Sequence, residues 1–258
     1  MGVLRGLYTA ASGMLAELRK TEVIANNIAN VDTPGFKRDE VALESFPAML
    51  LARVGDGGSD GVGGSAPVVG AMGTGVQAAG SYPDLTGAPL RLTGVPLDVG
   101  LDGPGFLVVR TPQGEVYTRR GDLVLTPGGV LVTAEGYPVL DVNRDELKLE
   151  GGLPVIGPDG TVLVGESQAG QLAVVEFENP AELEKLGQSM FAATAGSGAA
   201  RAATRTAVRQ GFLEASNANP VREMVDLIAV FRAYEAAQRA VQALDQALGR
   251  AANDLGRA

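Results

Sequence analysis

The sequence has 258 residues and a formal net charge of −9, and it contains neither cysteine nor histidine. This composition excludes disulfides, thiolate nucleophiles, histidine-ligated metal sites and Ser-His-Asp catalysis, and its acidic balance argues against nucleic acid as a partner. Hydrophobic residues make up 45% of the chain, enough for a substantial core, whereas 36 Gly and 14 Pro indicate many turns and irregular connections.

A helix with one apolar stripe is predicted for residues 3 to about 28. Apolar residues recur there at alternating steps of three and four, the spacing of one helix face. The stripe contains Leu4, Leu7, Ala11, Met14, Leu18, Ala25 and Ile28. The helix is expected to stop before Pro34 and Gly35, which favour a tight turn. On the pattern alone, an ordinary surface helix packed on its own core is an equal alternative.

The beginning of the chain carries no signal for the general secretion pathway. Residues 1–8 lack a basic region followed by a long apolar run. No apolar run approaches the ~20 residues needed to span a bilayer, so direct membrane insertion is not expected. A function outside the cytoplasm would therefore require export without a cleaved signal peptide.

The middle of the chain predicts a β domain. A glycine-dominated linker at 54–64 precedes short β-favouring runs that are separated by Pro-Gly and Gly turn signals. These runs lie at 106–109, 116–118, 123–125, 130–132, 162–164 and 172–177. A short helix at 179–186 and an extended or flexible connection at 192–203 are expected to follow. The spacing of the runs indicates an antiparallel, mainly all-β domain.

A second long helix is predicted from 220 to about 255. Asn219 is a favourable N-cap and Pro220 suits the first turn. Its stripe contains Leu227, Phe231, Tyr234, Val241 and Leu248, widened by Met224 and Ile228. A helix of about 50 Å with such a stripe needs a partner, and the amino-terminal helix is the obvious candidate for a coiled coil.

Several stretches in the same order resemble one known family. Residues 25–37 read Ala-Asn-Asn-Ile-Ala-Asn-Val-Asp-Thr-Pro-Gly-Phe-Lys, and residues 211–219 read Gly-Phe-Leu-Glu-Ala-Ser-Asn-Ala-Asn. Between them, 103–108 read Gly-Pro-Gly-Phe-Leu-Val and 129–138 read Gly-Val-Leu-Val-Thr-Ala-Glu-Gly-Tyr-Pro. Together they resemble the flagellar basal-body rod proteins of the F and G type, within the rod and hook axial proteins.

This resemblance implies a structural subunit rather than an enzyme, with no cofactor and no metal. Such a subunit would be exported through the flagellar type III apparatus, without a cleaved signal. It would assemble with itself and with other rod and hook proteins into the axial tube of the periplasm-spanning rod, which transmits torque. Pro220, Asp245 and 249–251 resemble the proximal rod type, whereas 73–76 and 232–235 resemble the distal type; the balance slightly favours the proximal type.

The expected fold class is α+β, with long terminal helices that pair as a coiled coil and flank an antiparallel β domain. The expected segments are 1–36 (axial helix and turn), 37–96 (glycine-rich linker and extended segment), 97–210 (β domain) and 211–258 (axial helix).

Two sets of residues are singled out by the stripes and the motifs. The side chains expected to bury against neighbouring subunits are Leu4, Leu7, Met14, Leu18, Ile28, Leu227, Phe231, Tyr234, Val241 and Leu248. The motif residues expected to cap, turn or hydrogen-bond at the junction of helix and β domain are Asn26, Asn27, Asn30, Pro34, Gly35, Phe36, Asn217 and Asn219.

Two alternatives from other functional classes stay open on the sequence. A glycoside hydrolase needs no histidine and could use two of the carboxylates Glu115, Asp122, Glu135, Asp141, Glu150, Asp159 and Glu166. A secreted binding module would be indicated if the β domain bound a defined ligand and the terminal helices were dispensable. Both leave the two strongly patterned ends of the chain without a role.

Overall fold

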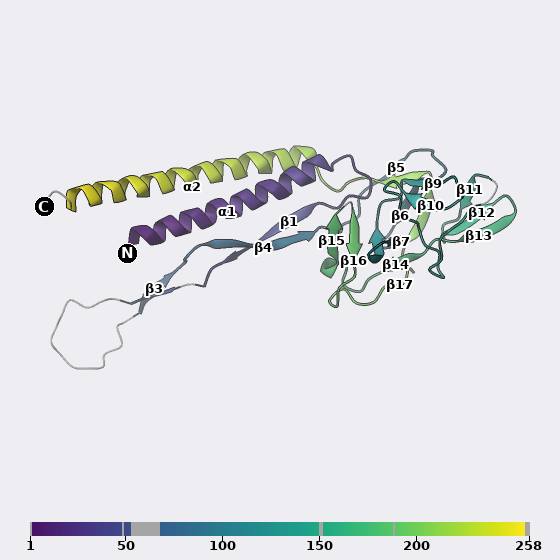
Figure 1. Ribbon diagram of the computed structural model, residues 1–258, viewed down its shortest axis with the longest axis horizontal. Helices are drawn as coiled ribbons and strands as arrows, with labels where there is room; N and C mark the ends of the chain where they lie inside the picture. The colour runs from purple at the N-terminus through teal and green to yellow at the C-terminus, as the bar shows by residue number, and fades with distance from the viewer. Residues whose placement is uncertain (1, 48, 53–67, 150–151, 188, 256–258) are drawn as a thin grey trace. The chain divides into compact units, whose positions relative to one another are not determined.

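The computed structural model describes residues 2–47, 49–52, 68–149, 152–187 and 189–255 (Figure 1). Contacts divide the chain into two units. The first, here called the helical unit, comprises Met1–Ala25, Glu40–Ser81 and Met224–Ala258. The second, here called the body, comprises Asn26–Asp39 and Tyr82–Glu223. The glycine-rich linker predicted at 54–64 lies outside the described residues.

The two predicted terminal helices are present. Helix α1 spans Gly2–Ala29 and helix α2 spans Pro220–Leu255. In the helical unit they run antiparallel and close together, since a Cβ atom added at Gly6 would lie 3.2 Å from Cδ1 of Leu244 (Figure 1). Within the described part of the chain, neither helix is long and apolar enough to cross a membrane.

A narrow β ribbon completes the helical unit. Strand β1 (Asp39–Ser45) pairs with β4 (Val76–Pro83), and β2 (Met49–Ala52) pairs antiparallel with β3 (Val68–Met72). The ribbon is tied to α1, because the Ser12 hydroxyl accepts the N–H of Val76 at 3.2 Å. Sequence analysis did not predict these strands: β1 reads Asp-Glu-Val-Ala-Leu-Glu-Ser, a composition that favours helix, so tertiary context decides its conformation.

The body confirms the prediction of a mainly antiparallel β domain. Its largest sheet has six strands in the order β15-β16-β8-β7-β14-β17. These strands are Glu184–Gly187, Met190–Ala192, Gly114–Thr118, Phe106–Thr111, Val174–Glu176 and Arg201–Ala202.

Smaller sheets surround the six-stranded sheet. The pairs are β5 (Leu90–Leu92) with β19 (Phe212–Glu214), β6 (Val99–Asp102) with β18 (Ala207–Gln210), and β9 (Leu123–Leu125) with β10 (Leu131–Thr133). A three-stranded sheet contains β11 (Pro154–Ile156), β12 (Thr161–Val164) and β13 (Ser167–Gln171).

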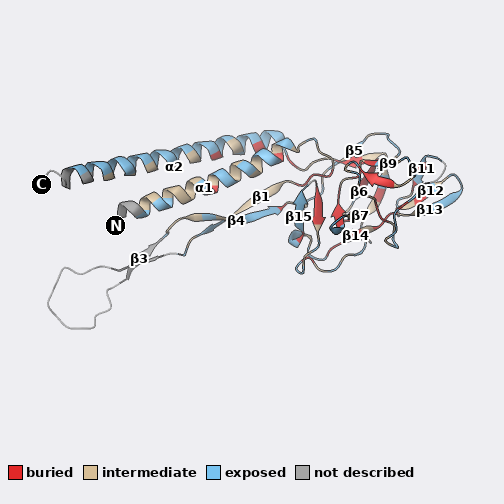
Figure 2. Ribbon diagram, viewed as in Figure 1, coloured by how far each residue is buried: buried red, intermediate tan, exposed pale blue. Residues whose placement is uncertain are grey.

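The hydrophobic core lies in the body, on both faces of strand β7 (Figure 2). Phe106 and Val108 pack into one cluster with Phe191, whereas Leu107 and Val109 pack into the other with Leu131. Successive side chains of a strand point to opposite faces, which is why this strand is apolar at four consecutive positions rather than alternating. Much of the surface of both helices is exposed by comparison (Figure 2).

One local prediction between residues 179 and 203 was wrong. The helix predicted at 179–186 is a single 3-10 turn, Pro180–Glu182, followed by strand β15. Pro180 favours a helical first turn, but pairing of β15 with β16 takes the next residues into the sheet. The extended connection predicted at 192–203 is irregular over 193–200 and ends in the two-residue strand β17 at the edge of the same sheet.

Candidate functional site

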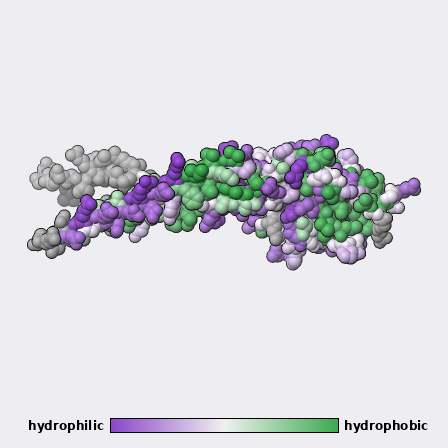
Figure 3. All heavy atoms as spheres, turned by 90° about the horizontal axis from the view of Figure 1, so that it is seen from above, coloured by the Kyte–Doolittle hydropathy of each residue, from purple (hydrophilic) through white to green (hydrophobic). Residues whose placement is uncertain are grey.

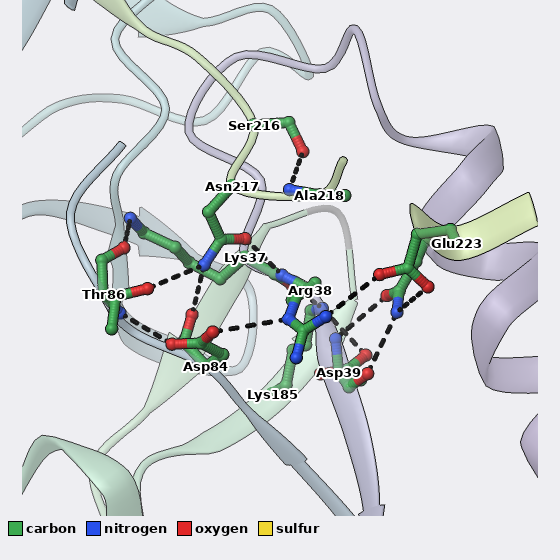
Figure 4. Close-up of polar contacts among 11 residues, drawn as sticks. Lys37, Arg38, Asp39, Asp84, Thr86, Lys185, Ser216, Asn217, Ala218 and Glu223 are labelled. Atoms are coloured by element: carbon green, nitrogen blue, oxygen red, sulfur yellow. Dashed lines mark hydrogen bonds and ion pairs between the residues drawn. The ribbon is translucent and has the colours of Figure 1, made fainter. Parts of the chain in front are cut away.

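The end of α1 and the start of α2 meet in one polar cluster within the body (Figure 4). We call it the anchor cluster; its members are Asn27, Arg38, Asp39, Asp84 and Glu223. Asn27 lies in the last turns of α1, Glu223 lies in the first turn of α2, and Asp39 begins strand β1. Within the body, the cluster therefore connects the end of α1 and the start of α2 to the β domain.

Asn27 fixes the chain reversal after α1. Its amide Nδ2 donates to the carbonyl oxygen of Asp39 at 3.0 Å, and its Oδ1 accepts the N–H of Asp39 at 2.9 Å. The same Nδ2 lies 3.3 Å from Oε2 of Glu223. Because Asn27 is buried, these partners satisfy polar groups that water cannot reach.

Arg38 bridges two carboxylates from distant segments. Its NH1 donates to Oε1 of Glu223 at 3.2 Å, and its Nε donates to Oδ2 of Asp84 at 3.3 Å. Glu223 is buried and lies where the positive end of the helix dipole favours an anion. The guanidinium thus holds the first turn of α2 against the segment that precedes β1.

Asn217 and Asn219 order the approach to α2. Asn217 accepts the N–H of Arg38 at 2.7 Å and donates to the carbonyl oxygen of Asp84 at 2.7 Å. Asn219 caps the helix, since its Oδ1 accepts the N–H groups of Val221 and Arg222 at 3.0 and 3.2 Å.

A buried ion triad lies beside the anchor cluster. Glu214 accepts hydrogen bonds from Lys37 Nζ at 2.7 Å and from Arg119 NH1 at 3.2 Å. All three side chains are almost completely buried. Burial lowers the pKa of Lys37, and the charge and hydrogen bond of Glu214 oppose that change only in part. Two backbone groups add to the triad: Lys37 Nζ donates to the carbonyl oxygen of Thr86, and the Ala88 N–H donates to Glu214.

The turn after α1 requires glycine and anchors an aromatic ring. Gly35 has φ +65°, and a Cβ atom there would lie 2.5 Å from the backbone of Arg119. Phe36 is buried, with the ammonium group of Lys185 4.2 Å from its ring centroid. Lys185 also donates to Oδ2 of Asp39 at 2.9 Å, which links the turn to the anchor cluster.

The structure brings some of the predicted motif residues together and separates others. Asn27 and Asn217 belong to the polar contacts described above, and Gly35 and Phe36 lie next to them. Asn26, Asn30 and Pro34 instead line an open hollow of about 530 Å³, together with Arg120, Glu135 and other residues. Asn30 donates to the carbonyl oxygen of Asn26, while the Asn26 side chain is exposed.

Sequence analysis missed the charged members of the site: Lys37, Arg38, Glu214 and Glu223. Lys37 and Glu214 lie inside the quoted motifs. Because lysine and glutamate are almost never fully buried, there was no reason to expect these two side chains in the interior. Glu223 lies in the first turn of α2, outside the quoted motifs. Nothing in the sequence pairs these residues across the nearly two hundred positions that separate them.

The predicted assembly residues differ in exposure. Seven are half-buried: Leu7, Met14, Ile28, Leu227, Tyr234, Val241 and Leu248. Leu18 and Phe231 are exposed, and the side chain of Leu4 lies outside the described residues. Their role in assembly stays a prediction.

The chemistry of this site is structural. Across the described residues, no three Asp or Glu side chains are grouped to hold a metal ion. Several carboxylates considered for glycoside hydrolysis are held by arginines instead: Glu115 lies 3.1 Å from Arg144, and Asp122 and Glu135 pair with Arg120. The anchor cluster can therefore position two helices, and the paired carboxylates do not resemble a free acid and base.

Comparison with known proteins finds family matches at the start, middle and end of the chain, in the same order as the sequence motifs. Family models match at 7–37 (flagella basal body rod protein), 100–172 (flagellar hook protein FlgE/F/G D1 domain) and 209–255 (flagellar basal body rod FlgEFG protein C-terminal). The flagellar basal-body rod protein FlgG of Bacillus subtilis is 31% identical, covering 95% of this chain and 97% of the relative. The chain belongs to the flagellar basal-body rod protein family.

Other relatives carry related names. The flagellar basal-body rod protein FlgF of Caulobacter vibrioides is 35% identical, covering 89% of both chains. The flagellar hook-basal body complex protein FlhO of Bacillus subtilis is 30% identical over 99% of this chain and 100% of the relative. The rod family is one of structural proteins rather than enzymes, so the hydrolase alternative is set aside.

Removal of the Asn27 side chain tests the anchor cluster in this rod-family chain. We expect Asn27→Ala to destabilise the junction by about 2 kcal/mol, because the N–H and carbonyl of Asp39 lose their buried partner. Hydrogen exchange measured at residues 36–41 should become faster. The matched control is Asn26→Ala at an exposed position, which should leave that exchange unchanged. Equal hydrogen-exchange protection of residues 36–41 in both variants would contradict the role of Asn27 in holding this segment.

Acid is expected to weaken the body through two carboxylates. Burial alone would raise the pKa of Asp84, but hydrogen bonds from Thr86 and Arg38 outweigh it and hold the pKa below the ordinary 3.8. For Glu176, burial is likewise outweighed by hydrogen bonds from Arg205 and Thr206, which hold its pKa below 4.5. Since the folded pKa values are lower than the unfolded ones, this stability is present above the unfolded values and is lost as pH falls through the folded ones.

The measurement is the urea midpoint of the full chain between pH 6 and 3. We expect Asp84→Asn to lower the midpoint at pH 6 and to flatten its decline toward pH 3. Asp145→Asn, at an exposed position, should reproduce the parent curve. If the curve of Asp84→Asn runs parallel to that of the parent, the Asp84 carboxylate does not contribute to the pH dependence of stability.

Proposed function

We propose that this chain is a structural subunit of the flagellar basal-body rod, which self-assembles through its terminal helices into the axial tube that transmits torque. The observation that carries the proposal is the anchor cluster, in which buried charges join the end of α1 and the start of α2 to the body. A subunit that passes torque along a tube needs its assembling helices fixed to the rest of the molecule.

The helices supply the assembling surface. α1 and α2 approach each other where Gly6 faces Leu244, and Leu7, Val241 and Leu244 are half-buried within the chain. In the assembled tube these helices would form a coiled coil. The apolar side chains that stay exposed in the single chain would be buried against neighbouring subunits. At roughly 1.5–3 kcal/mol for each fully buried large side chain, a few such contacts per subunit offset the loss of conformational freedom on assembly.

The partners follow from membership of the family. We propose that the chain assembles with itself and with other rod and hook axial proteins in the flagellar basal body, where the rod spans the periplasm. Export through the flagellar type III apparatus, without a cleaved signal peptide, would deliver it there.

We further propose that the subunit is of the proximal rod type. The sequence features near Pro220, Asp245 and 249–251 favour this type. Relatives named FlgG align over slightly more of this chain than the relative named FlgF, so position in the rod must be measured directly.

Electron cryotomography of the bacterium that carries this chain tests the function and the type together. Deletion of its gene should leave cells without hooks and filaments, and a density tag on the chain should lie at the inner-membrane end of the rod. A tag near the outer membrane would replace the proximal assignment by the distal one. Normal flagella in the deletion strain would overturn the proposed function.

A further inference from the structure

The segment that precedes α2 is bonded to several separate parts of the body. Residues 207–217, here called the closing segment, belong to the body and contain strands β18 and β19. β18 forms a two-stranded sheet with β6, and β19 forms another with β5. Within the described part of the chain, β5 and β6 therefore have no other strand as partner.

Strand β6 depends on this partner because it is buried. Val99, Gly100 and Leu101 are buried and lie opposite residues 208–210 of β18. Buried backbone N–H and C=O groups need hydrogen-bond partners, since water cannot reach them. Val208 itself belongs to the core cluster that contains Val99 and Leu101, although other hydrophobic residues of the body lie at its surface (Figure 3). Loss of β18 would therefore leave unpaired backbone groups beside the core.

The Gln210 side chain ties a further part of the body to the closing segment. Its Nε2 donates to the carbonyl oxygens of Pro96 and Pro154, both at 2.7 Å, and its Oε1 accepts the N–H of Ile156 at 3.1 Å. The N–H of Val208 adds a bond to the carbonyl oxygen of Pro158 at 2.9 Å. Strand β11 and the turn that follows it are thereby held to β18.

The closing segment also holds the turn after α1. The Gly35 N–H donates to the carbonyl oxygen of Glu214 at 2.8 Å, and Asn217 Oδ1 accepts the N–H of Arg38 at 2.7 Å. The Glu214 carboxylate accepts the buried ammonium group of Lys37. One short segment thus joins β5, β6, β11 and the turn after α1, which come from distant parts of the sequence.

We propose that the body folds only when the closing segment is in place, and that it opens as a whole when this segment leaves. Three separate parts of the body share the segment as a partner, so its departure would leave buried polar groups in all three at once. A body that is closed without it is therefore unfavourable, and folding becomes a single cooperative step.

This dependence has a consequence for passage through a channel. The contacts join the turn after α1 to residues 207–217, and these two segments lie near opposite ends of the sequence. A chain that is threaded from either end has them on opposite sides for most of its transit. The body would stay open during export and close once both have crossed. This consequence rests on the proposed function, whereas the cooperative closure rests on contacts within the body alone.

Hydrogen exchange of the full chain without denaturant tests the cooperative closure. If the closing segment and the core open in one step, the most protected amides of β18 and β19 should match those of β7 and β8 within tenfold. If the most protected amides of β18 and β19 exchange more than tenfold faster than those of β7 and β8, the closing segment leaves on its own. That result would overturn the proposal.

Gln210→Ala provides a second, independent test in the full chain. It removes three hydrogen bonds from the closing segment to residues 96, 154 and 156, outside β7 and β8. We expect exchange at least tenfold faster in β7 and β8, and faster by the same factor within threefold in β18 and β19. Arg209→Ala is the matched control at the next position, because its ion pair with Asp102 is exposed.

The control should leave exchange in all four strands unchanged. Faster exchange of Gln210→Ala confined to β18 and β19, or no change in any of the four strands, would overturn the cooperative closure. Either of these results would leave the rod assignment intact, since that assignment is decided by the deletion strain and the density tag.

Discussion

Glu214→Gln should lower the free energy of unfolding of the body by about 3–5 kcal/mol. Glu214 lies between the buried cations Lys37 and Arg119, and it accepts a hydrogen bond from each. The amide of glutamine has no charge, so the variant would leave two uncompensated cations in a site that excludes water. Breaking a buried ion group by removal of one partner is costly for this reason.

The measurement is hydrogen exchange of the full chain at strands β7 and β8, where protected core amides report opening of the body. Glu178→Gln is the matched control, because its ion pair with Arg201 is exposed and should contribute less than about 0.5 kcal/mol. Protection in Glu214→Gln equal to that of the control would show that the triad does not stabilise the fold. Lys37→Met should cost less, since it leaves Glu214 paired with Arg119.

Gly35→Ala is expected to destabilise the body by about 3 kcal/mol. The φ angle of +65° costs a residue with a side chain about 1–2 kcal/mol. In addition, the new Cβ atom would lie 2.5 Å from the backbone of Arg119, so the turn or the opposing strand must shift, at a further cost of about 1–3 kcal/mol. This shift would also disturb the hydrogen bond from the Gly35 N–H to the carbonyl oxygen of Glu214.

Gly87→Ala provides the matched control in the same unit. A Cβ atom added there meets nothing within 4 Å, so the change should be neutral or slightly stabilising through the unfolded chain. Thermal unfolding followed by near-UV circular dichroism, to which the buried Tyr117 contributes, compares the two. If the midpoints of the two variants agree, the turn at Gly35 is not as tightly enclosed as the geometry requires.

The terminal helices were predictable because their period is long and regular. The boundaries of α2 agree with the prediction at Asn219 and Pro220, where a capping side chain and a proline coincide. The strands β7, β8 and β9 were also recognised, since β-branched and apolar residues there are bounded by Gly and Pro turns. Local chemistry alone determines these elements.

The elements that were missed depend on distant partners. Strand β1 contains helix-favouring residues and is extended because it pairs with β4, more than thirty positions later in the chain. The residues of strand β15 were predicted to be helical, and Pro180 and Glu182 do form a short first turn. The residues that follow instead pair with β16 in the sheet. Neither pairing can be recognised from the residues of the strand itself.

The candidate site was predictable in part. The motif pointed to Asn27, Gly35 and Asn217 as residues that cap, turn or hydrogen-bond at the junction; Gly35 has a positive φ, whereas Asn27 and Asn217 bond to backbone groups of other segments. It gave no indication that Lys37 and Glu214 are buried together, because lysine and glutamate side chains are usually solvated. A buried ion pair of this kind can be recognised only when the positions of both side chains in the fold are known.

The central claim is that the terminal helices are the assembly surface of a rod subunit, and hydrogen exchange of the full chain at increasing concentration tests it most directly. The account predicts that amides of α1 and of α2 beyond Met224 gain protection as the sedimentation coefficient rises, while strands β7 and β8 remain protected throughout. A chain that stays monomeric, with both helices already protected at the lowest concentration, would contradict it.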